Sequence, residues 1–136
     1  MPKSRVDHKS ADRHKELAIK TVAMPADTNP SGDIFGGWVL SQMDMAGGIV
    51  AKRIAEGRVV TVAIDSMTFH KPVFVGDTLL CFASRLSVGR TSMKIKIEAW
   101  AERQSGNETA LVTEGVFTYV SVDEHRVPRP VPDRHS

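Results

Sequence analysis

The sequence predicts an α+β fold in which a curved, five-stranded antiparallel sheet wraps around one long central helix. Two observations lead to this prediction. The expected elements follow one another as a strand, a long helix and four further strands, and hairpin turns join most of those strands. A flat sheet covers only one side of a helix, so a long helix with no charge in its first half favours a sheet that curves around it.

The long helix is expected from about Phe35 to Glu56, with Gly57 ending it. Apolar residues recur at helical spacing along it, at Val39, Met43, Ala46, Val50 and Ile54. The chain carries no charge between Ile34 and Met43. We therefore expect this helix to be surrounded by protein rather than to lie on a surface.

Strands are expected at residues 17–24, 59–69, 78–88, 91–101 and 111–122. In the second of these, the apolar phase changes near Asp65 and Ser66, which predicts a bulge or a sharp bend. The third is apolar on both faces, so its outward side chains are expected to stay exposed and to favour a dimer or larger assembly. One side carries Leu80, Phe82, Leu86 and Val88, and the other carries Leu79 and Cys81.

The chain is expected to hold one globular domain, at residues 15–122. Its 136 residues, 41% hydrophobic and 25% charged, have the composition of an ordinary globular protein. Residues 1–14 are polar and without periodicity, and they are predicted to form a disordered leader. Residues 123–136 contain alternating prolines, which cannot join the interior of a sheet, so a proline-rich extended tail is predicted there.

Charge and cysteine content exclude several classes of protein. Eighteen basic and sixteen acidic side chains leave a net charge of +2, without the dense basic stripe of nucleic-acid-binding proteins. No apolar run is long enough to span a bilayer, and no secretory signal is recognisable. The single cysteine, Cys81, lies in an apolar strand, which favours a buried thiol in a reducing, cytoplasmic compartment.

Most familiar site motifs are missing from the sequence. It contains no His-Glu-x-x-His or Cys-x-x-Cys motif for a metal, no Gly-x-Ser-x-Gly elbow and no glycine-rich phosphate loop. Of the five histidines only His70 lies in the expected domain, at a strand end where a structural role is more common than catalysis. We therefore expect neither a metal site nor a cofactor.

Two pairs of glycines in or near the helix are unusual. Glycine costs roughly 0.5–1 kcal/mol relative to alanine inside a helix, so Gly36-Gly37 and Gly47-Gly48 suggest close approach to the backbone at both places. Gly36 and Gly37 fall in the first turn, where free amides and the helix dipole can stabilise an oxyanion. A tight turn without a ligand explains this first pair equally well.

Asp44 lies about two helical turns further along, on a stripe of small residues that includes Ser41, Gly47 and Gly48. No basic residue precedes Lys52 in this helix, so Asp44 has no local ion-pair partner. An uncompensated carboxylate in an enclosed helix is costly and is often functional. This pattern indicates a catalytic carboxylate, either a general base or a nucleophile.

Taken together, these residues resemble the hotdog-fold acyl-CoA thioesterases, and more narrowly the short bacterial acyl-CoA hydrolases related to brain acyl-CoA hydrolase. The resemblance runs from about Leu17 to Val122. It is carried by Asn29-Pro30-Ser31-Gly32-Asp33-Ile34-Phe35-Gly36-Gly37-Trp38, Met43-Asp44, Val59-Val60-Thr61-Val62-Ala63, Ser66-Met67, Lys71-Pro72, Val75-Gly76-Asp77 and Val88-Gly89-Arg90-Thr91-Ser92.

The resemblance implies hydrolysis of acyl-CoA to free coenzyme A and a carboxylic acid, with coenzyme A as part of the substrate. It implies a double-hotdog homodimer as the minimal active unit, commonly assembled into a hexamer as a trimer of dimers. The family's catalytic asparagine and aspartate fall on Asn29 and Asp44, from opposite subunits. Its coenzyme A surface falls on Ser66, Met67, Gly89, Arg90, Thr91 and Ser92.

Two alternatives stand beside this interpretation. The first is a hydratase or dehydratase of the same fold, for which we expect an acid–base pair that includes a histidine near the helix start. No histidine lies between Lys15 and Phe69, which disfavours this alternative. The other is a non-catalytic acyl-CoA-binding homo-oligomer. A pure binder gains nothing from an unpaired carboxylate at Asp44, which favours the enzyme.

Overall fold

The structure, a computed structural model, describes residues 15–132. The predicted leader, residues 1–14, lies outside the described residues, as do residues 133–136. In chain order the elements are β1 (Glu16–Val22), the short 3-10 helix η1 (Pro25–Asp27), α2 (Gly36–Ala55), β2 (Val59–Phe69), β3 (Thr78–Val88), β4 (Ser92–Glu102) and β5 (Thr109–Ser121).

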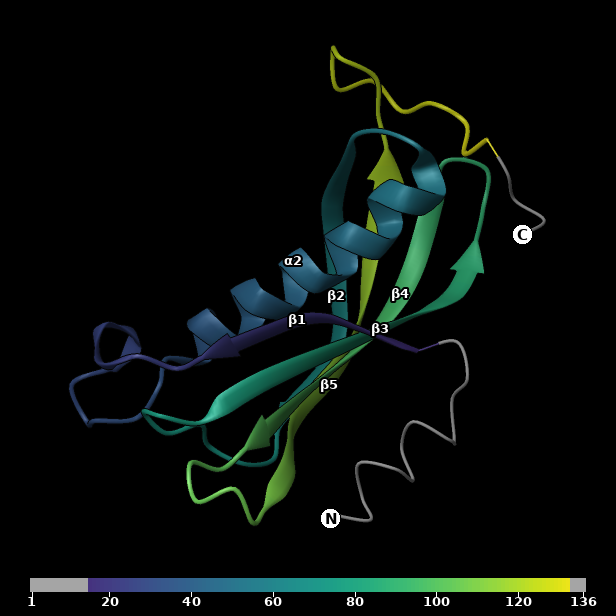
Figure 1. Ribbon diagram of the computed structural model, residues 1–136. Coiled ribbons are helices and arrows are strands. Elements are labelled where there is room, and N and C mark those ends of the chain that lie inside the picture. The colour runs from purple at the N-terminus through teal and green to yellow at the C-terminus, as the bar shows by residue number, and fades with distance from the viewer. Residues whose placement is uncertain (1–14, 133–136) are drawn as a thin grey trace.

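The five strands form one antiparallel sheet in the order β1-β3-β4-β5-β2, which curves around α2 (Figure 1). Strands β3, β4 and β5 follow one another through short turns and pair as neighbours. The helix connects β1 and β2, and these two strands therefore form the opposite edges of the sheet. The predicted α+β architecture is confirmed.

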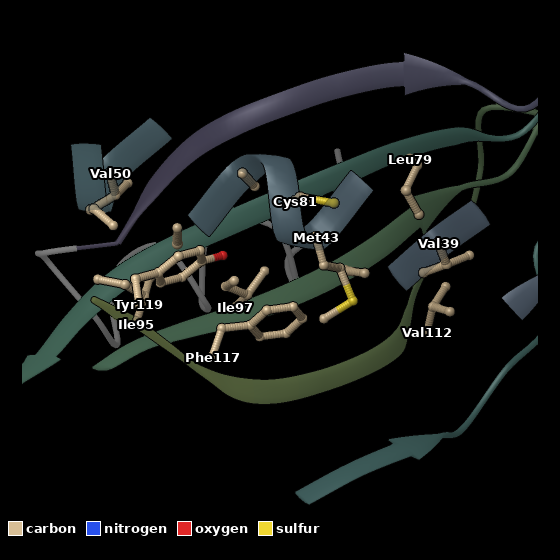
Figure 2. Close-up of a cluster of buried hydrophobic side chains, with 14 of the residues drawn as sticks. Val39, Met43, Val50, Leu79, Cys81, Ile95, Ile97, Val112, Phe117 and Tyr119 are labelled. Atoms are coloured by element: carbon tan, nitrogen blue, oxygen red, sulfur yellow. The ribbon is translucent and has the colours of Figure 1, made fainter. Parts of the chain in front are cut away.

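The core lies between one face of α2 and the concave face of the sheet. Figure 2 shows Val39, Met43 and Val50 of the helix beside inward side chains of β4 and β5 such as Ile97 and Phe117. On β4 every second residue is buried, which confirms the predicted alternation. Cys81 is buried in this core as predicted, and burial raises the pKa of its thiol to about 12.

Strand β2 contains the predicted irregularity. The register with β5 shifts between Asp65 and Thr68, and Ser66 adopts a left-handed φ of 58°. The predicted bulge or bend near Asp65 and Ser66 is therefore confirmed. A second shift, between Thr61 and Ala63, was not predicted.

The prediction that α2 is surrounded by protein is wrong for the single chain. The sheet covers only one side of the helix, and on the other side Met45 and Ile49 are 50% and 42% exposed. Neighbouring Val62 on the edge strand β2 is 55% exposed. The protomer therefore exposes apolar side chains both on the outer face of α2 and on the β2 edge.

The predicted exposure of the outer face of β3 is wrong for Leu80 and Phe82, which are buried, and correct for Leu86. Lys15 lies over Phe82 on this face. Its Nζ lies 5.4 Å from the centre of the Phe82 ring and is held there by an ion pair with Glu98, 2.7 Å away. The outer face of β3 is thus buried at Leu80 and Phe82 and open at Leu86, and further exposed apolar side chains lie on α2 and β2.

Candidate active site

Asn29 organises the loop that leads into α2. Its side-chain Oδ1 accepts hydrogen bonds from the backbone amides of Ser31 (2.9 Å) and Asp33 (3.1 Å). Its own amide donates to the Asp33 carbonyl at 2.7 Å. These bonds fix the carboxamide by its oxygen, and its NH₂ group has no acceptor among residues 15–132. A donor without a protein acceptor therefore sits at a fixed place in the loop.

Asn29 and Gly36 line the same cleft. This cleft has a volume of about 360 Å³ and lies between the loop, the start of α2 and the end of β2. Its other walls include Phe69 and His70. His70, which the sequence placed at a strand end as a structural residue, is exposed there and donates its backbone amide to Val112.

The amides of Gly36 and Gly37 are exposed at the start of α2. The next two amides, of Trp38 and Val39, both donate to the Phe35 carbonyl. Gly36 and Gly37 precede them, and within the described chain neither glycine amide has an acceptor. A Cβ at Gly37 would meet nothing within 4 Å. The protomer itself therefore does not require glycine at this position, which leaves room for a bound group.

Asp44 projects from α2 toward the β2 side of the helix and is half-exposed. Its Oδ1 accepts hydrogen bonds from the Thr61 hydroxyl at 2.7 Å and the Tyr119 hydroxyl at 3.1 Å. No cation forms an ion pair with it in the described part of the chain, as the sequence indicated. The expectation of an enclosed, uncompensated carboxylate is corrected by the two hydroxyl donors and the partial exposure.

Tyr119 is buried and contacts Asp44 from the sheet side of the helix. Its single hydroxyl proton is shared between Asp44 Oδ1 and the Asp44 carbonyl oxygen, which lies 2.9 Å away. In Figure 2 its oxygen is turned from the sheet toward the helix. Burial raises the pKa of Tyr119, and the neighbouring Asp44 charge raises it further. The phenol therefore stays protonated and acts as a permanent hydrogen-bond donor to the carboxylate.

The predicted coenzyme A residues lie in two separate places. Ser66 is exposed at the β2 bulge, whereas Met67 packs against the core with its sulfur beside Gly115. The other four residues form the β3–β4 hairpin. Strand β5 lies between the two places, which the strand registers put roughly 15 Å apart. One protomer does not bring them together.

The cleft with Asn29 and the carboxylate of Asp44 are also distinct. Asp44 does not line the cleft, and no hydrogen bond links it to Asn29. Residues 15–132 contain no group of His, Cys, Asp and Glu placed to hold a metal ion. No helix within the same residues is long and apolar enough to cross a membrane.

Comparison with known proteins identifies the family of this chain. Residues 31–106, more than half of the chain, match the thioesterase superfamily. The chain belongs to the thioesterase superfamily. An acyl-CoA thioester hydrolase of Salmonella typhimurium is 51% identical over 120 residues, which cover 86% of this chain and 90% of that protein.

Solved structures similar to this thioesterase superfamily chain include two hexameric thioesterases. A hexameric thioesterase from Yersinia pestis shares 55% identity, with a TM-score of 0.83 over 87% of this chain and 96% of that one. A hexameric hotdog fold thioesterase of Campylobacter jejuni shares 44% identity, with a TM-score of 0.81 over 85% and 90% of the two chains. The fold of this chain is therefore the hotdog fold, as the sequence resemblance implied.

Sequence reasoning did not identify the two hydroxyl partners of Asp44 in this thioesterase superfamily chain. The sequence did contain one indication of the Tyr119 contact. Tyr119 is the single tyrosine, in the inward phase of its strand, and a buried phenol needs a hydrogen-bond acceptor. Gly47 is the matching signal, because a Cβ at Gly47 would collide with the Tyr119 hydroxyl and with Ile97 Cδ1. This glycine serves packing within the protomer.

Gly47→Ala is expected to destabilise the fold by about 1–3 kcal/mol, because the new methyl group must displace Tyr119 or Ile97. The shift in the urea unfolding midpoint measures this loss. Gly48→Ala, in the same helix, is the matched control, because a Cβ there meets nothing within 4 Å. Equal losses for the two substitutions would contradict a role for the Tyr119 contact.

Proposed function

We propose that this protein hydrolyses acyl-CoA thioesters to coenzyme A and a carboxylic acid, without a metal or cofactor. The observation that carries the proposal is the Asp44 carboxylate, which is held by the Thr61 and Tyr119 hydroxyls and has no neutralising cation among residues 15–132. The similarity to named acyl-CoA thioester hydrolases supports the same reaction. Either role of a carboxylate in ester cleavage, general base or nucleophile, fits this geometry.

The developing charge on the thioester oxygen needs donors that are already in place. In this proposal the Gly36 and Gly37 amides supply them, because both lack an acceptor in the described chain and lie at the positive end of the helix dipole. The NH₂ group of Asn29 orients the attacking water or the carbonyl. Its oxygen is committed to the Ser31 and Asp33 amides, so the donor keeps a fixed direction.

A homodimer is the proposed minimal active unit. Asn29 and Asp44 do not share a cleft in one protomer, so a second subunit has to complete the site. Strand β2 offers the surface for it, because β2 is an edge strand with unpaired backbone groups and an exposed apolar residue, Val62. Thr61, the partner of Asp44, lies on this edge. Three such dimers in a hexamer are consistent with the hexameric relatives.

The coenzyme A moiety is proposed to contact Ser66 and Met67 of one region and the hairpin residues Gly89, Arg90, Thr91 and Ser92 of another. Met67 can take part only through its backbone, because its side chain packs inward. Arg90 is exposed at the hairpin tip, where a guanidinium suits a phosphate group. The separation of the two regions again indicates that two subunits form one binding surface.

A thiol-release assay with acyl-CoAs of several chain lengths tests the proposal. Release of free coenzyme A that depends on enzyme concentration is the expected result. Binding of acyl-CoA without release, for every chain length tried, would instead favour the non-catalytic acyl-CoA-binding homo-oligomer. The metal chelator EDTA is expected to leave the rate unchanged, because the proposed site uses only side chains and backbone amides.

Arg90→Ala is expected to raise KM for acyl-CoA roughly tenfold with little change in kcat, because a charge-assisted bond to phosphate is made equally in the ground and transition states. Steady-state kinetics at fixed ionic strength measure this. Arg85→Ala, an exposed arginine on β3 outside the hairpin, is the control. A selective fall in kcat for Arg90→Ala would contradict its proposed contact with phosphate.

A further inference from the structure

The chain does not end at the sheet but turns back on it after β5. Asp123 makes the turn: its Oδ1 accepts the amides of His125 (2.8 Å) and Val127 (2.9 Å). Its own amide donates to the Val127 carbonyl at 2.8 Å, and Val122 forms an isolated bridge with Pro128. The following segment, residues 128–131, is here called the C-terminal strap (yellow in Figure 1).

The strap is bound to the end of α2 by Arg129. The guanidinium donates from Nη2 to the Ala55 carbonyl at 3.0 Å and from Nε to the Val122 carbonyl at 3.2 Å. The Ala55 carbonyl is one of the last helical carbonyls, which have no intrahelical donor, and the positive charge also suits the negative end of the helix dipole. Gly57 makes room for it, because a Cβ there would collide with the guanidinium.

The strap is bound to the β3–β4 hairpin by Val131. The Val131 side chain is only 4% exposed and belongs to the core cluster, and its amide donates to the Arg90 carbonyl at 2.7 Å. The neighbouring Thr91 carbonyl accepts the amide of Ser121 at 2.8 Å. Both carbonyls at the hairpin tip are therefore held by the end of β5 and by the strap, while the Arg90 side chain stays exposed.

Two prolines stiffen the connection. Pro128 and Pro130 flank Arg129, and each fixes its own φ near −65° and restricts the preceding residue to extended conformations. A short, stiff segment therefore links the end of α2 to the backbone of Arg90. An exposed arginine binds an anion more tightly when its backbone is already fixed, because less conformational entropy is lost on binding.

We infer that Arg129 and Val131 are positioning residues for the recognition of the coenzyme A nucleotide, acting through the backbone of Arg90. The inference rests on the proposed function, in which the hairpin binds the phosphate-bearing part of the substrate. Neither residue touches the substrate. The strap anchors the hairpin, and the hairpin presents Arg90 to an anionic group.

Two substrates with the same acyl group separate this role from general stability. One is the acyl-CoA, and the other is the acyl thioester of N-acetylcysteamine, which lacks the phosphates and the nucleotide. Arg129→Ala is expected to raise KM for the acyl-CoA roughly fivefold or more, with kcat unchanged. The kinetics of the short thioester are expected to stay as in the wild type. Arg129→Lys retains the charge and is expected to recover part of the lost affinity.

Val131→Ala and Val127→Ala form a matched pair within the same tail. Val127 is 53% exposed, whereas Val131 is buried, so only Val131→Ala is expected to raise KM for the acyl-CoA. Equal changes of KM for both substrates, or a fall in kcat, would overturn the inference in favour of a purely structural strap. A wild-type enzyme that cleaves neither substrate would instead refute the proposed function.

Gly57→Ala tests the contact between Arg129 and the end of α2 by a change on the helix side. Its new Cβ displaces the Arg129 guanidinium, so it is expected to raise KM for the acyl-CoA on its own and to have no further effect when combined with Arg129→Ala. Additive effects of the two substitutions would overturn the link between the helix end and the hairpin.

Discussion

Replacing Asp44 with alanine is expected to lower kcat by about 100-fold or more, the scale of a positioned acid–base group, with the fold intact. The fold survives because the Tyr119 hydroxyl still has an acceptor, the backbone carbonyl at position 44. No buried donor is therefore left unsatisfied. Thiol release under saturating acyl-CoA measures kcat, and thermal unfolding of the same samples measures the fold.

The isosteric change Asp44→Asn isolates the charge. The amide oxygen can still accept from Thr61 and Tyr119, but the side chain can no longer take a proton or attack the carbonyl. Glu56→Gln is the matched control, because it removes an exposed carboxylate from the C-cap of the same helix. If Asp44→Asn and Glu56→Gln had equal, small effects, Asp44 would have no place in the chemistry.

Two inactive variants are expected to regain activity when their subunits are mixed. Asn29→Asp keeps the oxygen that binds the Ser31 and Asp33 amides but replaces the NH₂ donor, so the loop is retained and the orienting group is lost. In a heterodimer with Asp44→Asn, one site contains both substitutions and the other contains neither. Random pairing is then expected to restore about a quarter of the wild-type activity, since half of the dimers are mixed and each has one intact site.

Co-expression with two different affinity tags allows the heterodimer to be purified and assayed by thiol release. A mixture of Asp44→Asn with Asp44→Ala provides the control, because every site in it lacks the carboxylate. If the purified Asn29→Asp/Asp44→Asn heterodimer were no more active than either parent, both residues would have to act within one subunit.

The elements of the fold could be predicted because their signals are local. The alternation of β4 and the turn residues around β3 lie within a few residues of the structure that they specify, and the observed bounds differ little from the expected ones. Burial depends also on distant parts of the chain, and some predictions of burial were wrong for that reason. Lys15, which precedes β1, lies over the Phe82 ring, and no pattern within β3 reveals this contact.

The candidate site likewise contains some residues that could be predicted from the sequence and others that could not. Asp44 and the glycines at the start of α2 could be proposed from helical spacing alone. The hydroxyls that hold the carboxylate come from β2 and β5, and only the folded chain brings Thr61 and Tyr119 to one oxygen atom. The contacts of the strap could likewise not be predicted from the sequence, because they join residues 129 and 131 to a helix end and a hairpin.

The exposed apolar surface of α2 and β2 has a consequence for handling the protein. An association that buries Met45, Ile49 and Val62 gains free energy only while the subunits are associated, so dilution shifts the equilibrium toward free chains. Specific activity is therefore expected to fall when the enzyme is diluted far below the dissociation constant of the assembly. The melting temperature is expected to rise with protein concentration, so a single value describes the protein only at the concentration used.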